Sequence, residues 1–167
     1  AFMMIKRTDT AGQDWRAYHQ SVGNVNSLFM SSTAASTNMS SWNSATPTAS
    51  TISLGTDNGV NFSGGTYQAY LFAEKSGFSK FGAYTGNGSA DGPFVYTGFK
   101  PKYVMTKRTD STGNWSVWDS VRSSSADIHY RLYPNSTALE DTYTSPNAYV
   151  DFNANGFKIR TTSGDAD

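Results

Sequence analysis

A short polar sequence occurs twice in this chain. Lys6-Arg7-Thr8-Asp9 returns as Lys107-Arg108-Thr109-Asp110, and Trp15 returns as Trp115 after a loop that differs by one residue. Internal similarity at a fixed spacing is typical of repeat architectures. It predicts repeat units of about 100 residues. On this interpretation, residues 1–76 are the C-terminal part of one unit and residues 77–167 are the N-terminal part of the next.

The apolar pattern around both copies is that of a β-hairpin. Apolar residues precede each Lys-Arg pair, a polar loop containing Gly follows, and an aromatic strand beginning at Trp15 or Trp115 returns. Asn155-Gly156 predicts a third hairpin, with a positive φ at Gly156. Apolar residues at the helical spacing i, i+3, i+4, i+7 are absent over three turns. We therefore expect an all-β fold, an antiparallel β-sandwich or jelly roll.

Other segments carry weaker patterns. Residues 66–74 alternate with bulky apolar groups on both faces, which predicts a central strand covered on both sides. Residues 20–51 are rich in Ser, Thr and Asn and predict a long ordered loop with one or two short strands. Further strands are expected at residues 52–54, 78–84 and 128–133, the last with Ile128, Tyr130 and Leu132 facing the core.

Composition excludes several classes of function. Thirteen basic and thirteen acidic residues give a net charge of zero, which argues against binding to nucleic acid or a membrane surface through bulk electrostatics. Cysteine is absent, so disulfides and thiolate chemistry are excluded. No apolar run reaches the roughly 18 residues that a bilayer-spanning helix needs. A core is still possible, because aromatic residues make up 14% of the chain.

Residues 81–101 read FGAYTGNGSADGPFVYTGFKP, and with the second Lys-Arg-Thr-Asp they resemble a domain family of unknown function. That family recurs in predicted tail and fibre proteins of marine bacteriophages. The similarity extends over most of the chain, apart from residues 20–51. It implies a concanavalin-like sandwich on a virion surface, outside the cell, and a homotrimer as in other tail fibres. It implies no catalytic residue. Further segments that carry the resemblance are residues 63–67, 70–74, 118–120, 132–136 and 155–158.

Four aromatic residues on the returning strands are the first candidate site. These are Trp15, Tyr18, Trp115 and Trp118. They can pack in a core, stack on sugar rings or lie at a subunit interface, and core packing is favoured. Strand alternation puts Trp115 and Trp118 on opposite faces, so at most one of them should point into the core.

The repeated polar motif is the second candidate site. Arg108 offers a planar fork to a ligand or a neighbouring subunit, and Asp110 lies beside it in sequence. The alternative is a structural turn, in which Thr and Asp side chains accept hydrogen bonds from backbone N–H groups of the following loop. Occurrence in both copies favours the structural turn.

Other combinations of reactive residues are weak. A triad of His129, Asp127 and a serine among residues 123–125 can be assembled from almost any Ser-rich chain. Glu140 and Asp141 could serve as paired carboxylates in sugar cleavage, but neighbours in a loop usually point apart. Residues 86–92 resemble a calcium loop without its acidic density. We therefore expect no catalytic residue, metal or cofactor.

The sequence favours a non-enzymatic structural or adhesion repeat of a tail fibre or related virion appendage. Two alternatives stay open: a lectin-like module that binds host-surface glycans, and a glycan depolymerase. We expect a homo-oligomer and no nucleic-acid or membrane partner.

Overall fold

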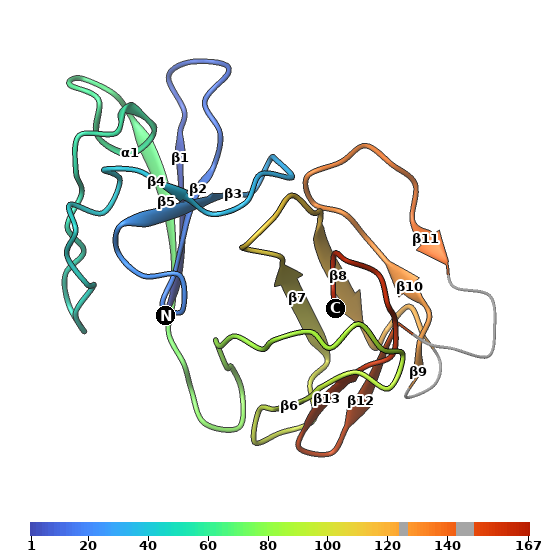
Figure 1. The fold of residues 1–167 in the computed structure, drawn as a ribbon. Helices are drawn as coiled ribbons and strands as arrows, with labels where there is room; N and C mark the ends of the chain where they lie inside the picture. The colour runs from blue at the N-terminus through green and yellow to red at the C-terminus, as the bar shows by residue number, and fades with distance from the viewer. Residues whose placement is uncertain (124–126, 143–148) are drawn as a thin grey trace. The chain divides into compact units, whose positions relative to one another are not determined.

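The computed structural model describes residues 1–123, 127–142 and 149–167 (Figure 1). The chain divides into two compact units, residues 1–74 with 109–112, and residues 75–108 with 113–167. The secondary structure is nearly all antiparallel β, as the sequence predicts, and the one helix of the described residues is the four-residue α1 (Asn58–Asn61). In these ranges no helix has the length and apolar character that a membrane crossing requires.

The first unit contains a five-stranded antiparallel sheet. Its strands are β1 (Phe2–Arg7), β2 (Arg16–His19), β3 (Asn26–Phe29), β4 (Thr37–Asn38) and β5 (Tyr67–Phe72), in the order β4-β3-β2-β1-β5. One face of β1 and β2 is buried with Trp42 and Val60, because alternate residues of a strand point to the same side. This core comprises Met3, Ile5, Tyr18, Trp42 and Val60, with Ile52, Leu54 and Tyr67 packed against it.

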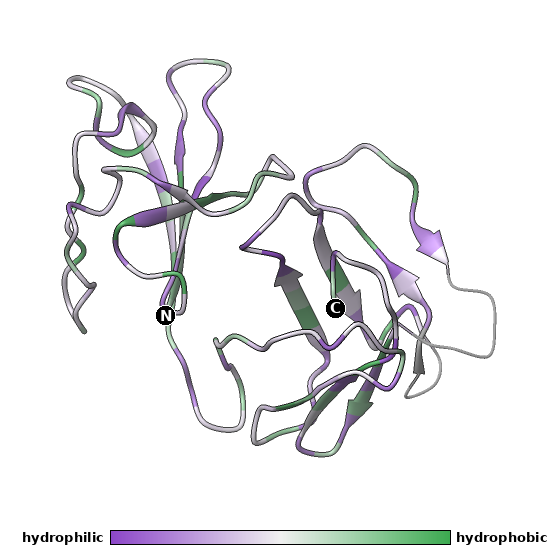
Figure 2. Cartoon of the chain, viewed as in Figure 1, coloured by the Kyte–Doolittle hydropathy of each residue, from purple (hydrophilic) through white to green (hydrophobic). Residues whose placement is uncertain are grey.

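The second unit holds three small sheets. Its strands are β6 (Phe94–Tyr96), β7 (Tyr103–Lys107), β8 (Trp115–Asp119), β9 (Asp127–Ile128), β10 (Tyr130–Arg131), β11 (Asp141–Thr142), β12 (Val150–Asn153) and β13 (Gly156–Ile159). They pair as β6-β13-β12-β9, β10-β11 and β7-β8. Hydrophobic residues run along β7 and β12 (Figure 2). The core comprises Val104, Trp118, Tyr149, Val150, Phe152, Phe157, Ile159 and Ala166.

The hairpins β1–β2 and β7–β8 have the same register. Met3 pairs with Tyr18 in the first, and Val104 pairs with Trp118 in the second. The neighbouring pairs correspond as well: Phe2 with His19 and Tyr103 with Asp119, then Met4 with Ala17 and Met105 with Val117. The similarity between the two stretches of sequence is therefore matched by the same local pairing of strands.

The interpretation of residues 66–74 as a central strand is wrong. β5 is the end strand of its sheet, and Tyr70, Leu71 and Phe72 are 46%, 60% and 43% exposed. Bulky apolar residues on both faces do not require cover on both sides. Tyr67 packs on the core, and Tyr70 lies against the ring of Trp15.

Three further strand predictions are corrected. Residues 52–54 form no strand, although Ile52 and Leu54 still pack on the core. Residues 78–84 form no strand beyond an isolated bridge between Lys75 and Ser79. Residues 128–133 divide between β9 and β10, and Arg131 is buried there while Leu132 is 40% exposed, the reverse of the predicted face. The guanidinium is buried because a carboxylate pairs with it, which apolar periodicity does not reveal.

The third hairpin is confirmed, but its predicted glycine conformation is wrong. β12 and β13 pair from Val150 with Ile159 to Asn153 with Gly156, around a turn at Ala154 and Asn155. Gly156 is not among the glycines with positive φ. A Cβ there would lie 2.2 Å from the carbonyl oxygen of Val95 on β6. Gly156 is thus needed for close approach of two strands.

Candidate functional site

The lysine of the repeated motif folds back onto the backbone of its own turn. Lys6 Nζ donates to the carbonyl of Arg7 at 3.0 Å and to that of Gln13 at 2.7 Å. Lys107 Nζ makes the corresponding bond to the carbonyl of Arg108 at 2.7 Å. Both lysines hold the end of the first strand to the loop that follows it.

In the first copy, the arginine and aspartate of the motif bind each other. Arg7 Nε donates to Asp9 Oδ1 at 2.7 Å and Arg7 Nη2 donates to Asp9 Oδ2 at 2.9 Å, while the guanidinium lies 4.1 Å from the ring centroid of Phe62. The hydrogen bond from Arg7 lowers the pKa of Asp9. Thr8 bonds to Thr66 instead of its own loop. The predicted acceptance of hydrogen bonds from the following turn is therefore wrong for Thr8 and Asp9.

The second copy is anchored differently at its tip. Asp110 is exposed and Arg108 is half-buried, with Nη1 3.5 Å from the carbonyl of Gly164. The backbone N–H of Asn114 donates to Asp165 Oδ1 at 2.8 Å. Arg108 and Asp110 thus lie at the turn of the β7–β8 hairpin, as predicted.

The four candidate aromatic residues take different roles. Tyr18 and Trp118 are 3% and 0% exposed and occupy corresponding places in the two cores. Trp115 is also buried, at 3%, but only Trp118 belongs to the hydrophobic core cluster, which agrees with the expectation that at most one of the two points into the core. Both faces of β8 are covered. Three of the four residues are therefore inaccessible to a glycan.

Trp15 is the exception, because it is only half-buried. Its ring lies 5.8 Å from that of Tyr70, centroid to centroid, with a tilt of 38°. Asp14 precedes it and accepts a hydrogen bond from the Ser31 hydroxyl at 2.7 Å. Two neighbouring aromatic rings of this kind can stack on a sugar.

Each unit also contains a buried arginine that pairs with an aspartate, which sequence reasoning missed. In the first unit Arg16 Nε donates to Asp57 Oδ2 at 2.8 Å, and Ser41 donates to the same oxygen at 2.6 Å. Asp57 also caps α1 by accepting from the N–H of Gly59. Burial alone would raise the pKa of Asp57, but the hydrogen bonds from Arg16, Ser41 and Gly59 lower it. The sequence signal that could have revealed this pair was a charged residue, Arg16, within a strand rich in aromatic residues.

In the second unit the pair is Arg131 and Asp141, surrounded by two tyrosines. Arg131 Nη2 donates to Asp141 Oδ2 at 2.8 Å, and the hydroxyls of Tyr149 and Tyr133 donate to the same oxygen at 2.7 and 2.8 Å. The guanidinium lies over both rings, 4.5 and 4.8 Å from their centroids. Arg131 and the tyrosines lower the pKa of Asp141 to about 2, and burial raises the pKa of Tyr133 to about 12.

The remaining candidates that the structure describes have separate partners. Glu140 binds Arg122 while Asp141 binds Arg131, so the two carboxylates have separate cationic partners. The Ser123 hydroxyl accepts from the backbone N–H of His129, and residues 124 and 125 lie outside the described residues. In the loop 86–92 the carboxylate of Asp91 binds Lys158 at 2.8 Å.

Residues 1–123, 127–142 and 149–167 hold no group of three or more His, Asp or Glu side chains placed to bind a metal ion.

Comparison with known proteins gives one relationship. Searches of curated proteins and of solved structures each find no match. A family model described as Domain of unknown function (DUF7483) matches residues 1–167. Because the match extends over the whole sequence, the chain belongs to this family of unknown function.

Proposed function

We propose that this chain is a structural and adhesive module of a phage tail fibre or a related virion surface appendage, and that it is not an enzyme. The proposal includes the interpretation that the protein is built from β-sandwich repeats of about 100 residues. The module lies outside the cell and assembles as a homo-oligomer, for which the resemblance suggests a trimer.

One observation carries this proposal. The residues that recur in the two copies of the motif maintain the hairpin, since both lysines bind the carbonyl that follows them and both hairpins share one register. A ligand site in both copies would need polar groups that face outward in both. In the first copy, Arg7 instead donates to both carboxylate oxygens of Asp9. The resemblance to fibre proteins supplies the biological context.

Immunogold electron microscopy tests the location. Antibodies raised against the purified chain should label the tail fibres or another surface appendage of phage particles. Label that is confined to infected cells and never found on particles contradicts the proposal.

Reducing-sugar release from host surface polysaccharide tests the non-enzymatic part of the proposal. Release above the level of a heat-denatured sample contradicts that part.

A second candidate function is glycan binding by the aromatic pair Trp15 and Tyr70. It is favoured by the partial exposure of both rings and by their contact with each other. On a glycan array, Trp15→Ala and Tyr70→Ala should abolish binding to any glycan that the wild-type chain retains. Phe78→Ala is the matched control, because Phe78 is an aromatic residue 78% exposed elsewhere. Equal losses in the three variants would rule out a site at the pair.

A further inference from the structure

Strand β7 has an unpaired edge in the part of the chain that the structure describes. β7 pairs with β8 alone, whereas β1, the corresponding strand of the first hairpin, lies between β2 and β5. β5 pairs with β1 over six residues, from Phe2 with Phe72 to Arg7 with Tyr67. The first hairpin therefore shows what fits the edge that β7 leaves open: an antiparallel strand with aromatic residues.

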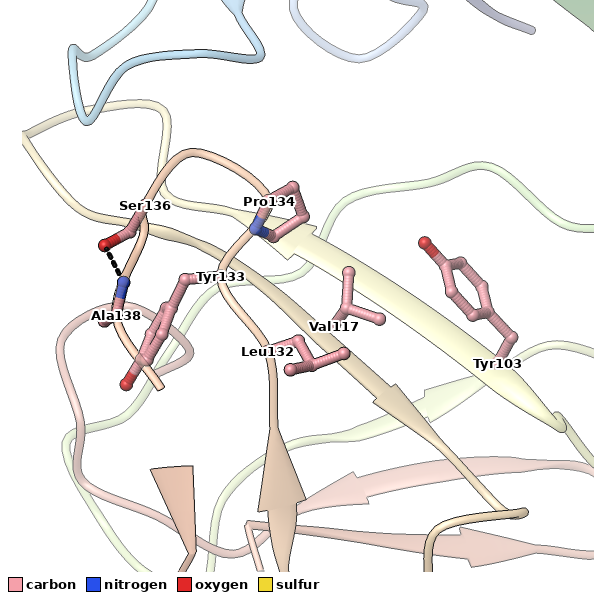
Figure 3. Close-up of a pocket in the computed structure, with 7 residues that line it drawn as sticks. All are labelled: Tyr103, Val117, Leu132, Tyr133, Pro134, Ser136 and Ala138. Carbon is pink, nitrogen blue, oxygen red and sulfur yellow. Dashed lines mark hydrogen bonds between the residues drawn. The ribbon is translucent and has the colours of Figure 1, made fainter. Parts of the chain in front are cut away.

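An apolar groove extends from Tyr103, on β7, across β8 to residues 132–138 (Figure 3). It has a volume of about 380 Å³ and is lined by Tyr103, Val117, Leu132, Tyr133, Pro134, Ser136 and Ala138. Tyr103 and Leu132 are 58% and 40% exposed. Val117 and Leu132 lie side by side, joined by a β-bridge.

The corresponding residues of the first unit are covered. Ala17 pairs with Leu28 as Val117 pairs with Leu132, and Phe2 corresponds to Tyr103. Phe2, Ala17 and Leu28 are 5%, 0% and 2% exposed. The ring of Phe72 on β5 contributes to this cover, 5.9 Å from the ring of Phe2. A strand like β5 would thus both pair with β7 and cover part of the groove.

The same chain carries a strand of this kind, whose outer edge pairs with no strand among the described residues. β5 is the end strand of its sheet, and no charged residue or proline interrupts its sequence Tyr-Gln-Ala-Tyr-Leu-Phe. Charges and prolines are the usual means of preventing an exposed edge from pairing with another chain. The net charge of zero removes long-range repulsion between copies.

We propose that β5 of one copy of this chain adds to the open edge of β7 of a second copy, forming one continuous sheet across the two molecules. Aromatic side chains of the added strand then lie over the groove at Tyr103. Because the two edges belong to different surfaces, the contact is heterologous and joins copies head to tail. This inference goes beyond the proposed function, since it requires neither a virion nor a glycan.

Sedimentation velocity of the full chain over a range of concentrations tests the proposal. The wild-type chain should associate as concentration rises. Leu71→Lys on β5 and Tyr103→Lys on β7 should each weaken association at least tenfold, because a lysine on an edge strand opposes pairing. Both side chains are exposed, at 60% and 58%, so the fold should persist. Val121→Lys is the matched control, with Val121 88% exposed and outside both strands.

Mixing the two variants identifies which edges meet. Each variant keeps the edge that the other has lost, so an equimolar mixture should form a heterodimer although neither variant associates alone. A synthetic peptide of residues 66–74 should inhibit association of the wild-type chain. The proposal is overturned by a wild-type chain that stays monomeric at every concentration, by equal loss in Val121→Lys, or by a mixture that stays monomeric. Association lost in Leu71→Lys but kept in Tyr103→Lys would mean that two β5 edges pair with each other, which also overturns it.

Discussion

Replacement of Gly156 by alanine tests why this hairpin contains a glycine. The added Cβ would lie 2.2 Å from the Val95 carbonyl oxygen and 2.7 Å from Phe94 Cζ, whereas ordinary contact begins at 3.4 Å. The Phe94 ring can rotate away, but the carbonyl belongs to the backbone of β6. The whole strand must therefore move by roughly 1 Å to accept one methyl group.

The cost follows from what that movement disturbs. β6 pairs with β13 at three positions, Gly156 with Tyr96, Phe157 with Val95 and Lys158 with Phe94. Overpacking of a fitted site costs about 1–3 kcal/mol, and each weakened backbone hydrogen bond adds about 1 kcal/mol. We expect Gly156→Ala to lower the free energy of unfolding by about 3 kcal/mol. The melting temperature should fall by about 6–12 °C.

Scanning calorimetry on three variants separates this explanation from a left-handed backbone. If Gly156 needed a positive φ, asparagine would be tolerated better than alanine. A steric clash predicts that Gly156→Asn is at least as unstable as Gly156→Ala. Gly82→Ala is the control, because its Cβ would meet nothing within 4 Å. A Gly156→Ala protein that melts with the wild type, or an asparagine variant clearly more stable than the alanine variant, would refute the reasoning.

Three further perturbations follow from the polar contacts. Because the pKa of Asp141 is lowered from 3.8 to about 2, its ion pair stabilises the fold above about pH 4, and this is lost as pH falls toward 2. Screening at a carboxylate 39% exposed leaves about 1 kcal/mol, so urea midpoints of wild type and Asp141→Asn should converge at low pH. Lys6→Met should lower the free energy of unfolding by about 1 kcal/mol in the same assay, through lost bonds to backbone carbonyls. Arg16→Ser should lower the free energy of unfolding by about 3–5 kcal/mol, because it leaves Asp57 buried without a cation. Adding Ser27→Arg should recover most of this loss. A double variant as unstable as Arg16→Ser would contradict the expectation that an arginine on β3 can replace the one on β2.

Features that depend on local sequence could be predicted. The three hairpins, the absence of a long helix in the described residues and the two short strands between residues 20 and 51 follow from strand alternation and turn residues. Core packing, which the sequence favours for the four aromatic residues as a group, is found for Tyr18 and Trp118.

Features that depend on which strands lie beside each other could not be predicted. The apolar pattern of β5 gives no information on whether a strand covers its outer edge. Burial of Trp115 and Trp118 on opposite faces of β8 depends on packing from distant parts of the chain. The reason for Gly156 lies in Val95, a residue that pairs with its neighbour from a strand far away in sequence. Each error arose because a tertiary contact decided the outcome.

The buried arginines show how the two units differ around a similar pairing of strands. Arg16 on β2 and Ser27 on β3 correspond to Ser116 on β8 and Arg131 on β10, so arginine and serine have exchanged neighbouring strands. The guanidinium nevertheless lies over the same aromatic position in both units, 4.8 Å from Phe29 in the first and 4.8 Å from Tyr133 in the second. Its partners are the carboxylate of Asp57 in one case and the Ser163 hydroxyl with Asp141 in the other. A buried arginine beside an aromatic ring therefore occurs at corresponding places in the two units, on a different strand in each. Alignment by sequence position pairs arginine with serine twice and misses this relationship.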